Sequence, residues 1–266
     1  MTMQKLLSKA RKAIQDFDMI QENDKIAVGL SGGKDSLTLL HILKNYQRFS
    51  PQKFELIAIT LNPGGVDNSP LYKLCKDLDI EFHEVQTDIK EIVFDIRKEK
   101  NPCSLCANLR RGALNDTAKK LGCTKVALGH HKDDAIETFI MSLFYEGRVN
   151  CFSPKTYLDK QDITVIRPMV YIEEYMTKKA TKEFNYPVIV NPCPANGSTK
   201  RQDVKELLAQ LNSTMPGVKK NIFGALNNSE KLFIWDKDKI NFILYIFHLL
   251  LSYCLLLSLK LHFLDV

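Results

Sequence analysis

Residues 31–36 read Ser-Gly-Gly-Lys-Asp-Ser, a set of residue types that suits phosphate binding. The two glycines allow backbone N–H groups to approach a ligand closely. Lys34 adds a positive charge, and the hydroxyls of Ser31 and Ser36 can donate hydrogen bonds. An apolar run at residues 25–30 precedes this glycine loop, and a second apolar run follows it. The pattern predicts a strand, a tight loop and a helix whose N-terminus faces an anion.

Two widespread phosphate-binding loops do not fit this segment. A Walker loop has four residues between its first glycine and its Gly-Lys pair, and then Ser or Thr. Here three residues separate Gly29 from Gly33, and Asp35 follows the lysine. The dinucleotide fingerprint Gly-x-Gly-x-x-Gly is also absent from this segment. A plain tight turn followed by a capped helix remains the alternative.

The stretch Gly-His-His-Lys-Asp-Asp-Ala-Ile-Glu-Thr at residues 129–138 is the second chemical signal. It follows a predicted strand at residues 125–129 and opens a predicted helix. The carboxyl ends of parallel strands meet at one edge of a sheet, so this segment should lie beside the glycine loop. Asp133 and Asp134 suit either Mg²⁺, which prefers oxygen ligands, or capping of the helix.

The cysteines form the third signal. Cys103 and Cys106 make a Cys-x-x-Cys pair directly before a predicted helix. Such a pair can be a redox dithiol, half of a zinc site or half of an iron–sulfur site. Cys193 lies between two prolines, which suits a ligand held in a fixed position. Cys75 and Cys123 fall on apolar faces and are expected in the core.

Predicted strands and helices alternate along most of the chain. An α/β fold with a parallel twisted sheet and helices on both faces, Rossmann-like, is therefore expected, with a small helical C-terminal part. The predicted strands cover residues 25–30, 54–61, 81–85, 125–129, 164–166 and 187–190. The predicted helices cover residues 3–17, 37–43, 71–78, 89–98, 105–120, 133–145 and 175–184.

The composition limits the protein class. The chain has 266 residues, 45% of them hydrophobic, which is enough for one or two domains with a substantial core. The net charge of +6 permits nucleic-acid binding without requiring it. The N-terminus lacks the apolar segment of a signal peptide, so a cytoplasmic protein is expected. In that compartment clustered cysteines indicate metal binding or catalysis more than disulfides.

The glycine loop after an apolar strand resembles the PP-loop of the N-type ATP pyrophosphatases, which split ATP between its α and β phosphates. Asp35 beside the pyrophosphate is then a plausible partner for Mg²⁺, and Thr60 and Asn62 are candidates for contact with adenine. The resemblance implies that the ATP and Mg²⁺ site is formed by Ser31, Gly32, Gly33, Lys34, Asp35, Ser36, Gly129, His130, Asp133 and Asp134.

A narrower resemblance, to the tRNA 2-thiocytidine biosynthesis family, covers residues 6–236. It is carried by the N-terminal segment with the glycine loop, the Pro-Cys-Ser-Leu-Cys-Ala-Asn-Leu-Arg-Arg-Gly segment, the segment at residues 129–138, Arg167-Pro168 and the Asn-Pro-Cys-Pro loop. It implies that Cys103, Cys106 and Cys193 bind a [4Fe–4S] cluster and leave one iron open for sulfide. A three-cysteine zinc site with a borrowed ligand, and a dithiol or persulfide mechanism, are the alternatives.

The same resemblance implies a two-step reaction. ATP adenylates the C2 oxygen of a cytidine in the tRNA anticodon loop, and sulfide then displaces AMP. Asp35, Asp134 and the three cysteines are the expected catalytic residues. The implied partners are tRNA, a sulfur donor such as a cysteine desulfurase, and a second copy of the chain in a homodimer.

Basic side chains near these motifs are candidates for contact with tRNA. Arg110 and Arg111 follow the cysteine pair and suit phosphate of ATP or tRNA. A solvated helix face is the plain alternative for all of these side chains. The remaining candidates are Lys9, Arg11, Lys12, Lys200, Arg201 and Lys205.

Three parts are expected along the chain: the PP-loop domain at residues 1–190, the third-cysteine loop and a basic helical segment at 191–236, and a hydrophobic tail at 237–266. The apolar run at residues 240–259 is about long enough to cross a bilayer. A membrane anchor, a helix buried against another subunit and an altered gene end all fit it. Membrane association is expected only through this tail.

Three other functions compete with thiocytidine formation. Lysidine synthetases share the glycine loop but need no thiolate trio. Archaeal-type thiouridine synthetases share the loop and the cluster but carry additional zinc-binding Cys-x-x-Cys pairs, whereas this chain has one such pair. A tRNA- or metal-binding module without catalysis is the third, and the intact glycine loop argues for turnover instead.

Overall fold

The computed structural model describes residues 2–97, 102–189 and 199–228. The chain divides into two compact units, Met1–Phe223 and Gly224–Val266. The fold and the candidate site described below belong to the first unit. The division expected from the sequence, at residues 190 and 236, stays a prediction.

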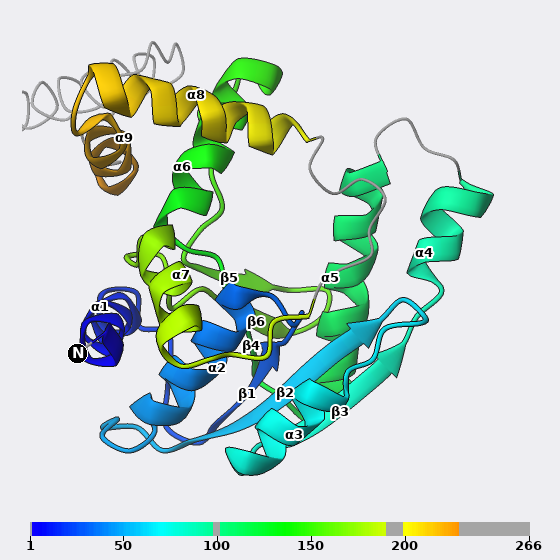
Figure 1. The fold of residues 1–266 in the computed structure, drawn as a ribbon. Coiled ribbons are helices and arrows are strands. Elements are labelled where there is room, and N and C mark those ends of the chain that lie inside the picture. The colour runs from blue at the N-terminus through cyan, green and yellow to red at the C-terminus, as the bar shows by residue number, and fades with distance from the viewer. Residues whose placement is uncertain (1, 98–101, 190–198, 229–266) are drawn as a thin grey trace, which may run out of the picture. The chain divides into compact units, whose positions relative to one another are not determined.

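A six-stranded sheet with the order β3-β2-β1-β4-β6-β5 forms the centre of this unit (Figure 1). Five strands are parallel, and β5 runs antiparallel to β6 at one edge. The expected parallel α/β sheet is therefore confirmed, with one antiparallel strand added. The strands are β1 (Asp24–Gly29), β2 (Phe54–Asn62), β3 (Glu81–Gln86), β4 (Lys125–Ala127), β5 (Lys155–Leu158) and β6 (Ile163–Ile166).

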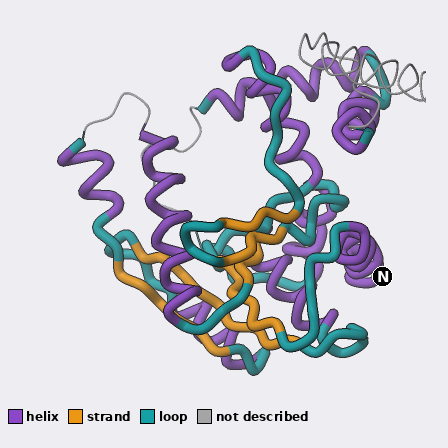
Figure 2. The backbone as a smooth tube through the Cα atoms, turned by 180° about the vertical axis from the view of Figure 1, so that it is seen from behind, coloured by secondary structure: helices purple, strands orange, loops and turns teal. Residues whose placement is uncertain are grey.

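Alternation along the strands builds a core on each face of the sheet. In β1, Ile26 and Val28 join one core cluster while Ala27 joins another, as expected when successive side chains point to opposite faces. The first cluster is covered by α1 (Thr2–Asp16), α2 (Lys34–Tyr46), α3 (Ser69–Asp77) and α7 (Glu174–Glu183). The second is covered by α5 (Pro102–Lys120). Figure 2 shows the strands between these helical layers.

Within the described residues, the remaining helices are α4, α6, α8 and α9. α4 (Ile89–Glu91) continues as the π-helical turn η1 (Ile92–Ile96), and α6 (Lys132–Met141) continues as the π-helical turn η2 (Ser142–Glu146). α8 (Lys200–Thr214) packs on α6 through a small apolar cluster that includes Ile136, Ile140, Val204 and Leu208. α9 (Val218–Asn227) follows α8.

One predicted strand is wrong over its described part. Residues 187–189 belong to no strand of the sheet. Pro187 has no N–H to donate to a neighbouring strand, and the N–H of Ile189 donates instead to the carbonyl of Gly32 (2.9 Å). This segment therefore closes over the glycine loop. Val190 lies outside the described residues.

No helix within residues 2–97, 102–189 and 199–228 is long and apolar enough to span a membrane. The hydrophobic tail predicted at residues 240–259 lies outside these ranges.

Candidate functional site

The glycine loop lies where β1 has β2 on one side and β4 on the other, the point at which ligands bind in open α/β sheets. Gly32 has φ +76°, a conformation that favours glycine. A Cβ at Gly32 would lie 2.9 Å from Cβ of Ile189, so the segment before residue 190 leaves no room for a side chain. Both facts require glycine here.

The loop leaves backbone donors at the start of α2 available to a ligand. Among the described residues no side chain caps the helix at Gly33. The Ser36 hydroxyl donates to the carbonyl of Gly33 (3.0 Å), and the Ser31 hydroxyl donates to Ser36 Oγ (3.2 Å). The first N–H groups of a helix have no partner within the helix, so this uncapped end suits an anion.

The second predicted segment packs directly on the first. A Cβ at Gly129 would lie 3.0 Å from the carbonyl carbon and oxygen of Asp35 and 3.1 Å from the nitrogen of Ser36. Buried His131 caps α6: its Nδ1 accepts from the N–H of Asp134 (3.2 Å), and the Asp134 carboxylate accepts from the N–H of His131 (2.8 Å). The start of α6 is thereby fixed against the start of α2.

Asp133 and Asp134 occupy different environments. One oxygen of Asp133 accepts from the N–H of Glu174 (2.8 Å) and the other from Lys219 Nζ (2.9 Å). Burial opposes ionisation of Asp133, yet these two donors outweigh it and lower its pKa. Asp134 lines a pocket together with Asp35. Asp133 therefore joins α6 to α7 and α9, whereas Asp134 is the carboxylate at the pocket.

Lys34 is held beside the loop by two carboxylates. Its Nζ lies 2.6 Å from Asp35 Oδ2 and 3.3 Å from Glu174 Oε1. Burial disfavours the charged form, but the two carboxylates outweigh burial and raise the pKa of Lys34. Thr177 also donates to Asp35 Oδ1 (2.7 Å). Glu174 and Thr177 were not predicted, because the sequence of α7 shows no feature that links it to the loop.

Burial keeps His130 neutral, and Arg167 sets which ring nitrogen carries the hydrogen. Arg167 Nε donates to His130 Nδ1 (3.3 Å), and its guanidinium lies 5.0 Å from the ring centroid of Phe152. Burial lowers the pKa of His130 to about 4. A guanidinium can only donate, so Nδ1 is the acceptor and the neutral ring carries its hydrogen on Nε2. His130 lines the same pocket as Asp134.

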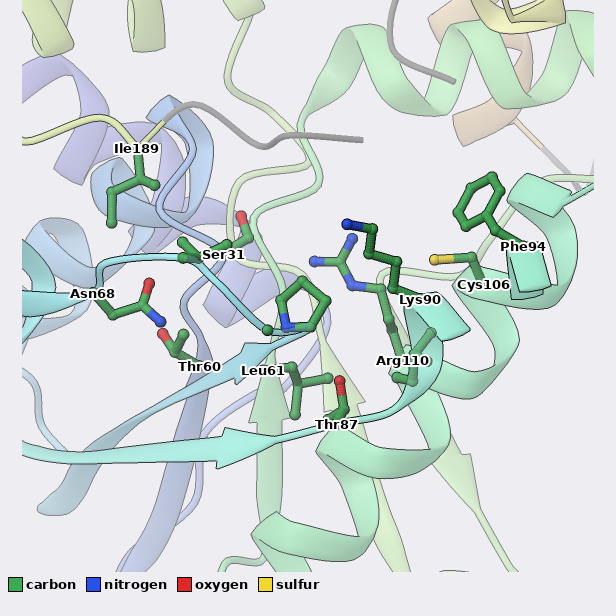
Figure 3. Close-up of a pocket in the computed structure, with 14 residues that line it drawn as sticks. Ser31, Thr60, Leu61, Asn68, Thr87, Lys90, Phe94, Cys106, Arg110 and Ile189 are labelled. Carbon is green, nitrogen blue, oxygen red and sulfur yellow. The ribbon is translucent and has the colours of Figure 1, made fainter. Parts of the chain in front are cut away.

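Two adjoining pockets form a cleft over the loop; both are lined by Ser31, Leu61 and Arg110. The first, the loop pocket, also contains Asp35, Asp134 and Arg111. The second, the strand-edge pocket, extends towards the ends of β2 and β3. Figure 3 shows its walls, with Ser31, Thr60 and Asn68 opposite Cys106, Lys90 and Arg110.

The cysteine pair belongs to the first two turns of α5. Cys106 is half-buried and lines the strand-edge pocket, and Cys103 is exposed. Cys193 lies outside the described residues. Within the described residues, no three His, Cys, Asp or Glu side chains group as a metal site. Cys106 can supply a thiolate at the cleft, Cys103 precedes it by about one helical turn, and a cluster needs further ligands.

The two predicted adenine contacts also have structural partners. The hydroxyl of Thr60 donates to the carbonyl of Leu30, which ties the end of β2 to the glycine loop. Asn62 donates to the carbonyl of Val66 (3.0 Å) and accepts from the N–H of Gly64 (2.9 Å). Thr60 lines the strand-edge pocket, whereas Asn62 shapes the turn that follows β2.

Half of the predicted tRNA-contacting cations pair with acids of the same unit. Lys9 pairs with Glu173, Lys12 with Asp16, Arg201 with Glu137, and Lys205 with Glu174. Arg11 and Lys200 are exposed. Arg110 and Arg111 line the loop pocket.

The other described cysteines are explained by packing. Cys75 and Cys123 are buried, as predicted, and burial raises their pKa values to about 12 and about 11. Cys151 is half-buried, and its thiol donates to the carbonyl of Ala135 (3.4 Å).

Comparison with known proteins gives concordant matches. A family model described as a PP-loop domain matches residues 3–209. The tRNA-cytidine(32) 2-sulfurtransferase of Geobacter sulfurreducens is 37% identical over 239 residues, covering 88% of this chain and 93% of the relative. The enzyme of the same name from Pseudomonas fluorescens is 38% identical over 242 residues, covering 90% of this chain and 88% of the relative.

A solved structure agrees with these matches. The U34-tRNA thiolase NcsA from Methanococcus maripaludis, determined with its [4Fe-4S] cluster, superposes with a TM-score of 0.70 at 26% identity. The similarity covers 88% of this chain and 80% of that chain.

Proposed function

The chain belongs to the PP-loop domain family, among the tRNA-cytidine(32) 2-sulfurtransferases, and from this membership we propose how its cleft uses ATP to replace the C2 oxygen of a tRNA cytidine with sulfur. One observation carries the proposal: Cys106 and Ser31 line the same pocket. A group that handles sulfur and a loop suited to ATP phosphates therefore open onto one space.

The first step is activation of the cytidine. The C2 oxygen attacks the α-phosphorus of ATP, the bond to the β-phosphate breaks, and pyrophosphate leaves. The uncapped start of α2, the hydroxyls of Ser31 and Ser36, and the cation of Lys34 stabilise the charge that develops on pyrophosphate. Asp35 and Asp134 line the loop pocket, and their carboxylates would hold Mg²⁺ there.

The second step is replacement of the activated oxygen. Sulfur adds to C2, the C2–O bond breaks, and AMP leaves with the oxygen that came from cytidine. Cys103 and Cys106 would hold a [4Fe–4S] cluster, with Cys193 as the predicted third ligand. When bound, the cluster supplies a site for sulfide. Neutral His130 offers an Nε2–H donor in the pocket that Asp134 lines. Above its pKa of about 4 the ring carries no positive charge, so it acts there as a neutral donor.

The partners follow from this chemistry. The substrate is tRNA, and the target base must leave its stack to reach the cleft, which is easiest in a single-stranded loop. ATP is the co-substrate, and its phosphates bind at the loop of residues 31–36. A cysteine desulfurase is the expected class of sulfur donor, and a homodimer is the expected assembly.

Nucleoside analysis tests the proposal. The protein, purified without oxygen, is incubated with tRNA that lacks the modification, ATP, Mg²⁺ and sulfide, and the digested tRNA is examined by mass spectrometry. We expect ATP-dependent 2-thiocytidine, and none from Cys106→Ser, although this variant should still bind ATP. Formation of lysidine or 2-thiouridine instead, or no modified base from the iron-loaded wild type, would overturn the proposal.

A further inference from the structure

The helix that starts in the cleft ends in an exposed aromatic surface. α6 begins beside Asp134 and continues into η2, where Phe144 is 57% and Tyr145 is 47% exposed. We define the aromatic patch by these two residues and their neighbours. It comprises Leu143, Phe144, Tyr145, Arg148, Val149 and Lys200, and all six side chains are exposed.

The backbone keeps these side chains on the surface. The turn η2 has a π-helical pattern, and Gly147 ends it with φ +63°, a conformation that favours glycine. The N–H of Arg148 returns to the carbonyl of Ser142 (3.1 Å). The turn is thus hydrogen-bonded while its large apolar side chains stay exposed. Contiguous exposed apolar groups of this kind mark binding surfaces more often than ordinary surface.

The charges around the patch favour a nucleic acid. Lys200 Nζ lies 4.6 Å from the ring centroid of Tyr145, and exposed Arg148 follows Tyr145 by three residues. The acid in the turn, Glu146, accepts from the hydroxyl of Ser142 (3.3 Å). Aromatic faces combined with cations bind unpaired bases and the phosphates between them. Lysine is depleted at protein–protein interfaces, which makes a second protein a poorer fit.

We propose that the aromatic patch is a stacking platform for unpaired bases of the anticodon loop whose target cytidine enters the cleft. This inference rests on the proposed function. Ten residues of helix separate Asp134 from Phe144, which corresponds to about 15 Å. A base in the cleft and a base on the patch can therefore belong to one loop, a few nucleotides apart.

The test measures the affinity of the protein for an anticodon stem-loop RNA by fluorescence anisotropy. Phe144→Ala/Tyr145→Ala should weaken binding at least about 5-fold, because stacking on one aromatic side chain contributes about 1–3 kcal/mol per base. Phe144→Tyr/Tyr145→Phe keeps both rings and should bind like wild type. Tyr72→Ala removes an equally exposed ring from α3 and serves as the matched control. ATP affinity should not change in any of these variants.

Each outcome decides the proposal. Unchanged RNA affinity in the double alanine variant, with wild-type thiolation intact, would overturn the stacking platform while leaving the proposed function in place. If light scattering shows that the double variant breaks a dimer and RNA affinity per protomer is unchanged, the patch is an interface between copies and the proposal is wrong. Failure of the iron-loaded wild type to thiolate tRNA would instead count against the proposed function.

Discussion

At the scale of single residues, two adjacent aspartates differ because of what packs around them. Both oxygens of Asp133 receive donors from α7 and α9, while Asp134 lines the loop pocket. The sequence predicted both as ligands and left their relative importance open. Neighbours on a helix point in directions about 100° apart, and the elements that enclose Asp133 lie far along the chain.

Asparagine substitutions should separate the two roles. Asp134→Asn should lower the rate of ATP cleavage at least about 100-fold, because a carboxylate that would hold Mg²⁺ beside the phosphates is lost. Thermal stability should change little, because the asparagine oxygen can still accept from the N–H of His131. Asp133→Asn should lower the midpoint of thermal unfolding, because two charge-assisted contacts are weakened. Pyrophosphate release measures the rate of ATP cleavage, and calorimetry measures the midpoint of thermal unfolding. Slow ATP cleavage in Asp133→Asn together with lowered stability in Asp134→Asn would contradict these two roles.

Two histidines should make stability depend on pH. Burial lowers the pKa values of His41 and His130 to about 4. In the unfolded chain they titrate near 6.5, so between these values the unfolded state binds more protons and stability falls as pH falls. We expect about 1–2 kcal/mol per histidine to be lost between pH 7 and pH 5.

Urea unfolding at both pH values measures this loss, and His41→Gln should remove about half of it. For His130, nitrogen NMR should show a neutral ring with its hydrogen on Nε2 down to pH 5. A ring that becomes charged near pH 6.5 would show that burial does not hold it neutral.

At the scale of elements, the approach of α6 to α2 requires glycine at residue 129. Gly129→Ala would place a methyl group about 3.0 Å from backbone atoms of Asp35, so the start of α2 must shift. ATP affinity, measured by calorimetry, should fall at least about 10-fold, or about 1.4 kcal/mol. Gly112→Ala in α5 meets nothing within 4 Å and should be neutral or slightly stabilising. Equal effects of the two changes would refute the packing argument.

The first two turns of α5 are predicted to bind iron. Cys103→Ser and Cys106→Ser should each yield protein with less iron per chain and less visible absorbance after anaerobic reconstitution. Cys123→Ala removes a buried thiol from the core and should keep its iron, although it should be less stable by about 1–2 kcal/mol. Full iron content in both serine variants, or tightly bound zinc in the wild type, would contradict the prediction that these cysteines bind an iron–sulfur cluster.

The elements show what sequence patterns can and cannot reveal. β1 and β2 were predicted closely because they are apolar runs ended by glycine or a turn. β5 was missed because its four residues are mostly half-exposed and form an antiparallel edge. Residues 187–189 have strand-like composition, but the N–H of Ile189 bonds to Gly32. The closeness of Ile189 to the loop depends on tertiary packing that no local pattern contains.

At the scale of the whole molecule, several positive charges are paired with nearby carboxylates, which the net charge of +6 does not show. Glu174 forms ion pairs with Lys34, Lys178 and Lys205. These contacts outweigh the effect of burial and lower the pKa of Glu174 to about 2. Such pairing ties α2, α7 and α8 together and leaves the arginines of α5 at the cleft. The sequence predicted a basic protein, but which cations stay available depends on the fold.

We propose that ATP activates the C2 oxygen of the cytidine in the same cleft that delivers sulfur. The most direct test labels that cytidine oxygen with ¹⁸O and follows it through one turnover. We expect one ¹⁸O in the phosphate of AMP for each 2-thiocytidine formed, with unlabelled pyrophosphate. Label released into water, or ATP cleaved to ADP, would contradict it.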